Sequence, residues 1–170
     1  MASNVMIVKL IGEVVSAMVV GDLVFNYEPG RALQIVNSLA QDDASDTYKA
    51  LKYPLIALFT PITVIEDGNL GYKRVKIAKV VIATESDQNT LVADRFLTGG
   101  TFESILYPAK EEFLNQLALH ENVVGYDPET FPNAYEEDPG VQPMPVTNDF
   151  IDCITILNLE FYINQIKTCS

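Results

Sequence analysis

The sequence has only one histidine, His120, and only two cysteines, Cys153 and Cys169. A single histidine excludes metal sites built from two histidines, including the His-Glu-x-x-His helix of metalloproteases. Two cysteines without a Cys-x-x-Cys pair do not make the dense framework of a disulfide-rich secreted domain, and they favour a reducing cytoplasm. His120 follows a predicted helix, where the helix dipole favours it, so we interpret it as a structural residue.

Basic residues are also scarce. The chain has 11 lysines and arginines against 23 acidic residues, which gives a formal net charge of -12. Binding to phosphates requires clustered lysine and arginine, so this balance argues against sequence-independent affinity for nucleic acid. Two interpretations stay open: nucleic acid is irrelevant to this protein, or it passes close by and must not be retained.

A long apolar run is missing as well. The apolar stretch near the N-terminus has no basic opening segment and is interrupted by Lys9 and Glu13, so we expect neither a signal peptide nor a membrane span. The chain has 170 residues, of which 48% are hydrophobic. This is enough to bury a core without disulfides or a metal, and we expect one structural domain over residues 1–170.

The apolar spacing predicts several elements in the first half of the chain. Residues 5–20 repeat apolar side chains at helical spacing, with Gly21 as the expected stop. Residues 23–27 read as a short strand that ends in a turn at Glu28-Pro29-Gly30, and residues 33–40 as a second short helix. Residues 55–59 form a continuous apolar run typical of a buried strand, with Pro61 predicting an irregular or edge-like far end. An Asp-Gly turn within 66–71 joins it to a strand at 75–82, which predicts a hairpin.

In the second half, residues 91–97 are ambiguous between a helical turn and an extended link. A longer helix follows, with Thr101 as its expected cap. Pro108 would break the interior of that helix, so we expect a kink or a fresh start near Leu106. Residues 155–163 alternate in the manner of a half-buried strand. The order predicts an α+β fold, with a mostly antiparallel sheet and helices packed on one face.

Residues 121–147 form an acidic, proline-rich arm that has no lysine or arginine and holds five of the nine prolines. We expect no regular element there. Long structureless loops in compact domains usually bind something or are mobile, and both interpretations stay open. The candidate interface residues in the arm are Glu129, Tyr135, Glu136, Glu137 and Asp138.

Two further interface candidates lie outside the arm. Arg95 is interpreted either as a buried or interfacial ion-pair partner or as a surface charge, since a guanidinium suits a fixed carboxylate. Tyr107 belongs either to the core or to an interface, because aromatic residues anchor both.

No group of residues predicts a catalytic, cofactor or metal site. Asp42, Asp43 and Asp46 lack the glycine and closing glutamate of a calcium loop. Gly99 and Gly100 precede a helix without the lysine pattern of a phosphate-binding loop, so we interpret them as a flexible cap. The aspartates beside the last strand, Asp149 and Asp152, are interpreted as turn residues that bond to their own backbone.

Several segments, taken together, carry a resemblance that covers most of the chain. They are KYPLIAL at 52–58, VVIATESD at 80–87, ADRF at 93–96, ILYPAKEEFLNQL at 105–117 and NDFIDCITILNLEFYI at 148–163. In their order and spacing the chain resembles the tail-terminator-like, or neck, proteins of tailed bacteriophages, in particular those of Bacteroidetes phages. It departs from the family after the Leu-Tyr-Pro triplet, where Ala109 stands in place of a larger apolar residue.

This resemblance implies a tail-terminator-like subunit that acts as a structural protein and not as an enzyme, with no cofactor. It would be made in the host cytoplasm and reside in the neck or tail region of the virion. Six or twelve copies would form a ring between the portal or its adaptors and the tail. Genomic DNA would pass through the lumen of that ring without specific binding, and no membrane is involved.

Two other function classes stay open from the residues alone. The first is a small α+β enzyme or ligand-binding domain that uses Asp149, Asp152 or Glu112, which requires a pocket with perturbed carboxylates. The second is an inhibitor whose acidic surface imitates DNA.

Overall fold

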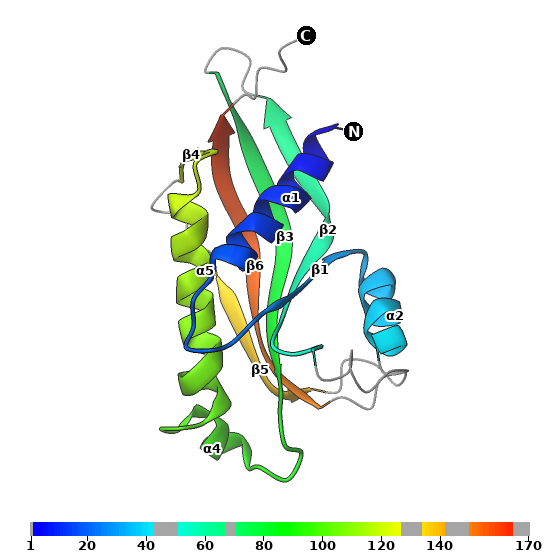
Figure 1. Ribbon diagram of the computed structural model, residues 1–170, viewed down its shortest axis with the longest axis vertical. Coiled ribbons are helices and arrows are strands. Elements are labelled where there is room, and N and C mark those ends of the chain that lie inside the picture. The colour runs from blue at the N-terminus through cyan, green and yellow to red at the C-terminus, as the bar shows by residue number, and fades with distance from the viewer. Residues whose placement is uncertain (1, 43–50, 67–70, 127–133, 142–149, 165–170) are drawn as a thin grey trace.

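The computed structural model describes residues 2–42, 51–66, 71–126, 134–141 and 150–164. It confirms the predicted α+β fold, with a mixed and largely antiparallel sheet (Figure 1). Among these residues no helix has the length and apolarity needed to cross a membrane. In chain order the elements are α1 (Ala2–Ala17), β1 (Asn26–Gly30), α2 (Ala32–Asp42), β2 (Leu55–Glu66), β3 (Tyr72–Glu85), α4 (Val92–Phe96), η1 (Phe102–Leu106), α5 (Tyr107–Leu119), β4 (Val123–Gly125), β5 (Tyr135–Val141) and β6 (Ile151–Asn164).

The sheet is built around the hairpin of β2 and β3, as predicted. Its strand order is β1-β2-β3-β6-β4, and β5 also pairs with β6. Only β1 and β2 run parallel, and every other pair is antiparallel. Because β5 pairs with the first half of β6 and β4 with its last residues, the two short strands share one side of β6.

The main core lies between the sheet and the helices α1, η1 and α5, which cross the same face of the sheet (Figure 1). The apolar stripe predicted for the first helix is buried there, including Ile7, Ile11 and Val14. The stripe of the later helix is buried in the same layer, with Phe102, Leu106 and Phe113 fully enclosed. The 3.6-residue period of both segments therefore identified the faces that pack on the sheet.

Helix α2 corrects the expectation that all helices pack on one face. Its buried residues Ile35 and Leu39 form a second cluster with Leu55, Ala57 and Cys153. These strand positions alternate with those of the main core, so they point to the opposite face of the sheet. The helix α2 therefore covers the second face at one end of the sheet.

The prediction for residues 23–30 was wrong by several residues. Strand β1 begins at Asn26 and contains Glu28-Pro29-Gly30, the segment that the sequence marked as a turn. Since β1 is the edge strand, a proline can be accommodated in it without losing a bond to a second neighbour. The helix α1 also ends at Ala17 and not at Gly21, which lies in the following turn with a φ of 55°.

The expected fresh start near Leu106 is confirmed. A π-helical turn, η1, ends at Leu106, and α5 then begins at Tyr107 with Pro108 in its first turn, where the missing N–H is not needed. The residue that precedes η1, Thr101, makes no side-chain cap hydrogen bond. Its hydroxyl has a different partner, described below.

The arm at 121–147 contains regular structure, contrary to our expectation. Strand β4 and strand β5 both lie in it, and each pairs with β6. Neither segment has the apolar alternation of a strand. Their extended conformation is therefore stabilised by pairing with β6 and not by local sequence preference. The remaining residues at 127–133 and 142–147 lie outside those that the structure describes.

A line of irregular residues crosses the three long strands and divides the sheet. The β2–β3 register shifts between Phe59 and Ile62, and Asn158 of β6 has a φ of 52°. In β3 the side chains that face α1 and α5 are at odd positions up to Ile77 and at even positions from Val80, and in β6 a change from even to odd positions occurs at Asn158. We call the line through Pro61, Ala78 and Asn158 the crease. Below it lies the covered half, with residues 55–59, 79–85 and 151–157. Above it lies the open half, with residues 62–66, 72–77 and 159–164.

The last strand is therefore only partly the half-buried strand that its sequence predicted. In the open half, buried Leu159, Phe161 and Ile163 alternate with more exposed neighbours. In the covered half, every residue from Ile151 to Ile156 is buried. The difference arises because α2 and its cluster pack on the second face of the covered half only.

Candidate functional site

A buried ion pair joins Arg95 to Asp152 at the base of the covered half. Arg95 is 2% exposed and Asp152 is fully buried, and Arg95 Nη1 lies 2.6 Å from Asp152 Oδ1. Asp152 is held on β6 with the same orientation as Ile154 and Ile156, which places its carboxylate on the side of α4 and η1. Arg95 belongs to α4, the segment whose conformation the sequence left ambiguous.

Further hydrogen bonds join this pair to three neighbouring segments, while Arg95 Nε is buried without a hydrogen-bond partner among the described residues. Asp152 also accepts hydrogen bonds from the Thr101 hydroxyl and from the backbone N–H of Gly140, the latter at 2.7 Å. Arg95 Nη2 donates to the carbonyl oxygens of Asp87 and Thr90, at 2.6 and 3.0 Å, and Nη1 also donates to the Ser86 hydroxyl. Loop 86–90, α4, the start of η1 and the tip of β5 are thus fixed to β6.

Two glycines allow the backbone to approach this centre. A Cβ on Gly100 would lie 2.3 Å from the carbonyl oxygen of Arg95, which only a glycine avoids. Gly140 has a φ of 69°, and a Cβ there would lie 2.9 Å from the Phe150 ring, which the Arg95 guanidinium also contacts. The requirement for glycine at both positions supports a structural role for the centre.

A pocket of about 350 Å³ lies beside the ion pair. Besides Arg95 and Asp152 it is lined mainly by small and acidic residues, among them Glu85, Asp87 and Asp94. Both oxygens of the Asp152 carboxylate are already engaged by protein donors. Across the described ranges, no group of three histidine, cysteine or acidic side chains has the arrangement of a metal site.

The other residues considered for chemistry also make structural contacts. His120 lies 3.1 Å from Glu13, which joins the end of α5 to α1. Glu112 accepts hydrogen bonds from the Val19 N–H at 3.3 Å and from Gln116 at 2.8 Å. Asp149, Asp43, Asp46 and Cys169 fall outside the residues that the structure describes.

The interface candidates of the arm are distributed over both sides of β5. Tyr135 and Glu137 face α5, where Tyr107 donates a hydrogen bond to Glu137 at 2.7 Å and Lys110 lies 3.8 Å from the centre of the Tyr135 ring. Desolvation, followed by the contact with Glu137, raises the pKa of Tyr107 to about 12. Tyr107 is partly buried and hydrogen-bonded to the arm, and its role in an interface stays a prediction.

Glu136 and Asp138 lie on the other side of β5. They pair with Thr155 and Cys153, which point away from α5, and both acids are exposed. Of the remaining candidates, Arg95 is a buried ion-pair partner and not a surface charge, while Glu129 lies outside the described residues. The structure thus brings Tyr107, Tyr135 and Glu137 together and separates them from the other acids.

A second surface, which sequence reasoning missed, is the face of the open half that points away from α1 and α5. Arg74 and Lys76 alternate with buried Val75 and Ile77, and Lys79 precedes buried Val80, so all three basic side chains point to this side of the sheet, Arg74 and Lys76 in the open half and Lys79 just across the crease in the covered half. We call it the basic face. Its signal in the sequence was the alternation of Arg74 and Lys76 with Val75 and Ile77, whereas Lys79 reaches the same side only because the alternation changes at Ala78.

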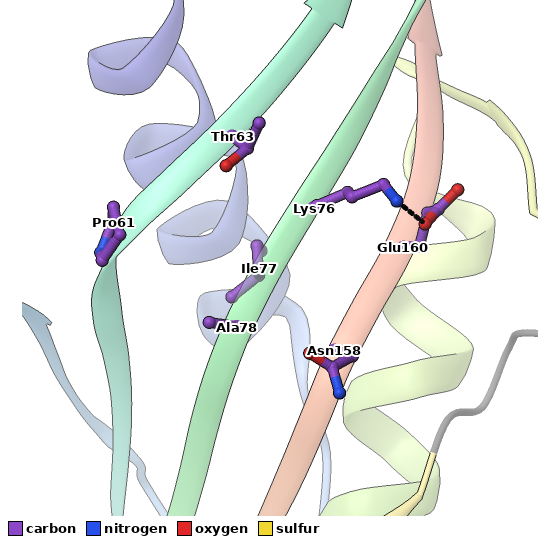
Figure 2. A pocket seen from close by; sticks show the side chains of 7 residues that line it. All are labelled: Pro61, Thr63, Lys76, Ile77, Ala78, Asn158 and Glu160. Carbon is purple, nitrogen blue, oxygen red and sulfur yellow. Dashed lines mark ion pairs between the residues drawn. The ribbon is translucent and has the colours of Figure 1, made fainter.

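A pocket of about 340 Å³ lies on the basic face at the crease. Figure 2 shows it between the three long strands, with Lys76 and Glu160 joined at 3.0 Å along one side. Thr63, Ala78 and Asn158 complete much of its lining (Figure 2). Because Ala78 is small and Asn158 departs from strand geometry, the strands leave a depression where side chains would otherwise fill the surface.

Comparisons with protein-family models, with curated proteins and with solved structures found no match for this chain. The following proposals therefore depend on the residues, the geometry and the resemblance of the segments described above.

Proposed function

We propose that this protein is a structural virion subunit that forms a ring in the head-to-tail connector of a tailed phage. In this role it joins the portal or an adaptor to the tail and surrounds the channel through which DNA passes. The proposal covers a non-enzymatic protein without a cofactor that acts in the neck or tail region of the virion.

The observation that carries the proposal is the difference between the two outer edges of the sheet. On one side, β1 pairs only with residues 55–59 of β2, so among the described residues the β2 edge at 62–66 has no strand beside it. This edge contains Thr63, Val64 and Ile65, has no proline, and carries a charge only at Glu66. Such an edge is a ready site for pairing with another chain.

On the other side, the edge formed by β5 carries the features that prevent strand pairing. It has three acidic residues, Glu136, Glu137 and Asp138, together with Pro139 and a register irregularity between Asp138 and Val141. Since the two edges differ, a contact between the β2 edge of one copy and another surface of the next copy is heterologous. Heterologous contacts that close produce rings.

The distribution of charged groups is consistent with this role. The buried ion pair of Arg95 and Asp152 connects segments of the fold, and Arg74 and Lys76 pair with Glu160 across neighbouring strands. A net charge of -12 also suits a protein that surrounds moving DNA, since phosphates are repelled and not retained.

Native mass spectrometry and negative-stain microscopy of the purified chain test this function. We expect a closed ring of one defined copy number, six or twelve, with a central opening. A protein that stays monomeric at all concentrations, alone and with neck partners, would contradict the proposal. A monomer that competes with DNA for a basic DNA-binding protein would instead favour the alternative of a DNA-mimicking inhibitor.

A further inference from the structure

The basic face concentrates positive charge on a chain that is otherwise acidic. The strand β3 carries four of the 11 basic residues of the chain, namely Lys73, Arg74, Lys76 and Lys79. Lys73 pairs with Glu66, while Arg74 and Lys76 share a single acid, Glu160. On the basic face, the three cations Arg74, Lys76 and Lys79 are accompanied by one carboxylate, that of Glu160. The face therefore has an excess of positive charge.

This face also has a shape that can receive side chains from another molecule. The pocket at the crease lies next to Lys76, whose side chain is 45% exposed, and is lined by Thr63, Ala78 and Asn158 (Figure 2). Thr63 and Asn158 supply polar groups, while Pro61 and Ala78 supply an apolar surface. An acidic side chain and its backbone therefore find both charge and hydrogen-bonding groups there.

The chain itself contains a complementary segment. The strand β5 presents Glu136 and Asp138 on the same side of the sheet as the basic face, but in the covered half and on the far side of β6 from β3. Within the described residues neither acid forms an ion pair with Arg74, Lys76 or Lys79. Their charges are thus available to a neighbour.

We propose that the basic face of one copy receives the acidic strand β5 of the next copy, with Glu136 and Asp138 directed to Lys76 and Lys79 around the crease pocket. This inference rests on the proposed self-association and adds to the contact of the β2 edge a second one, between side chains of β5 and the basic face, whose pocket includes Thr63 of that edge. Two copies of a chain with a charge of -12 repel each other at long range, so a stable contact requires local charge complementarity of this kind.

Charge reversal on each side of the proposed contact tests it. We expect Lys76→Glu alone and Glu136→Lys alone to weaken assembly by at least about tenfold, because each places like charges opposite each other. An equimolar mixture of the two variants restores assembly, since each acidic surface then meets a basic one in an alternating ring. The double variant, with both changes in one chain, also assembles. Native mass spectrometry measures all four samples.

Matched controls separate this effect from a general effect of charge. Lys9→Glu makes the same change on the exposed side of α1, where Lys9 is 78% exposed, and Glu111→Lys does so on an exposed position of α5. Both variants assemble like the parent chain. Thermal unfolding confirms that each variant is folded before its assembly is measured.

A steric variant tests the same surface without changing charge. Ala78→Tyr fills the crease pocket from an exposed position of β3, where an aromatic residue is compatible with a strand. We expect this variant to fold and to lose assembly. It keeps the inference testable if Lys76→Glu disturbs its pairing with Glu160.

The outcomes distinguish failure of the inference from failure of the proposed function. If the parent chain never assembles, both are wrong. If the parent chain forms rings and the single charge variants and Ala78→Tyr form them equally well, the ring contact lies elsewhere and only this inference is overturned. If Lys76→Glu assembles normally but loses retention of duplex DNA, the basic face contacts DNA and the inference is likewise overturned.

Discussion

The covered and open halves of the sheet share three strands and the same layer of helices, yet they differ on the other face. In the covered half, α2 and its apolar cluster pack on that face, and the buried pair of Arg95 and Asp152 lies at the base. In the open half, the same face carries Arg74, Lys76 and Glu160 at the surface. One continuous sheet therefore has a half enclosed on both sides and a half enclosed on one.

This comparison separates the charges that hold the fold from those that are available for binding. A buried pair leaves an uncompensated charge when one partner is removed, which strongly destabilises a protein. Surface ion pairs contribute little to folding, because water screens them. We therefore expect the covered half to determine stability and the open half to determine recognition.

The largest expected effect comes from Asp152→Ala, which leaves the Arg95 guanidinium buried without its carboxylate. We expect the free energy of unfolding to fall by about 3 to 5 kcal/mol. Urea denaturation followed by circular dichroism measures this change. The control in the open half, Glu160→Ala, also removes a carboxylate that pairs with basic residues, and it is expected to cost no more than about 1 kcal/mol. Equal losses in the two variants would show that the halves do not differ in this way.

The thiol of Cys153 probes how well the second face of the covered half is closed. Burial raises the pKa of this thiol to about 11, so its reactive thiolate is scarcer by about 100-fold near pH 8 than in an exposed cysteine. Peptide mass spectrometry after brief alkylation should find Cys153 unmodified in the folded protein and modified in urea. Since the unfolded thiol ionises first, stability should also decrease as the pH rises from about 9 towards 11. Equal alkylation rates in the folded and unfolded states would mean that α2 does not shield this face.

Two glycines provide the third and smallest comparison. In Gly100→Ala, the new Cβ would lie 2.3 Å from the Arg95 carbonyl oxygen, so the backbone must shift, and we expect a loss of about 1 to 3 kcal/mol. In Gly125→Ala, on β4 beside the open half, nothing lies within 4 Å of the new Cβ. That variant should be neutral or more stable by roughly 0.5 to 1 kcal/mol. Thermal unfolding of both variants measures these changes in stability. A neutral Gly100→Ala would contradict a requirement for glycine beside the Arg95–Asp152 pair.

The sequence was sufficient where a single segment determines its own structure. The period of α1 and the hairpin of β2 and β3 follow from apolar spacing and a turn signal. Pro108 located the start of α5 because a proline can occupy only the first turn of an uninterrupted helix. In each case the physical cause lies within about a dozen neighbouring residues.

The sequence was insufficient where a distant partner determines the outcome. The strand β5 is acidic and contains Pro139, and only its pairing with β6 makes it a strand. Thr101 was expected to cap its own helix, but its backbone is itself helical, which rules out cap geometry, and its hydroxyl donates to the distant carboxylate of Asp152. One local signal of the ion pair was available. Asp152 lies two residues before Ile154 and four before Ile156, so strand alternation directs its side chain into the core with theirs.

The position of β6 has a consequence for synthesis of the protein on the ribosome. This strand follows all the other described elements in the chain, yet it lies between β3 on one side and β4 and β5 on the other. Until it is translated, the nascent chain presents the apolar edge of β3 together with helices that have only part of their core. Mutual repulsion between the many acidic side chains opposes association of such incomplete chains before β6 has been synthesised.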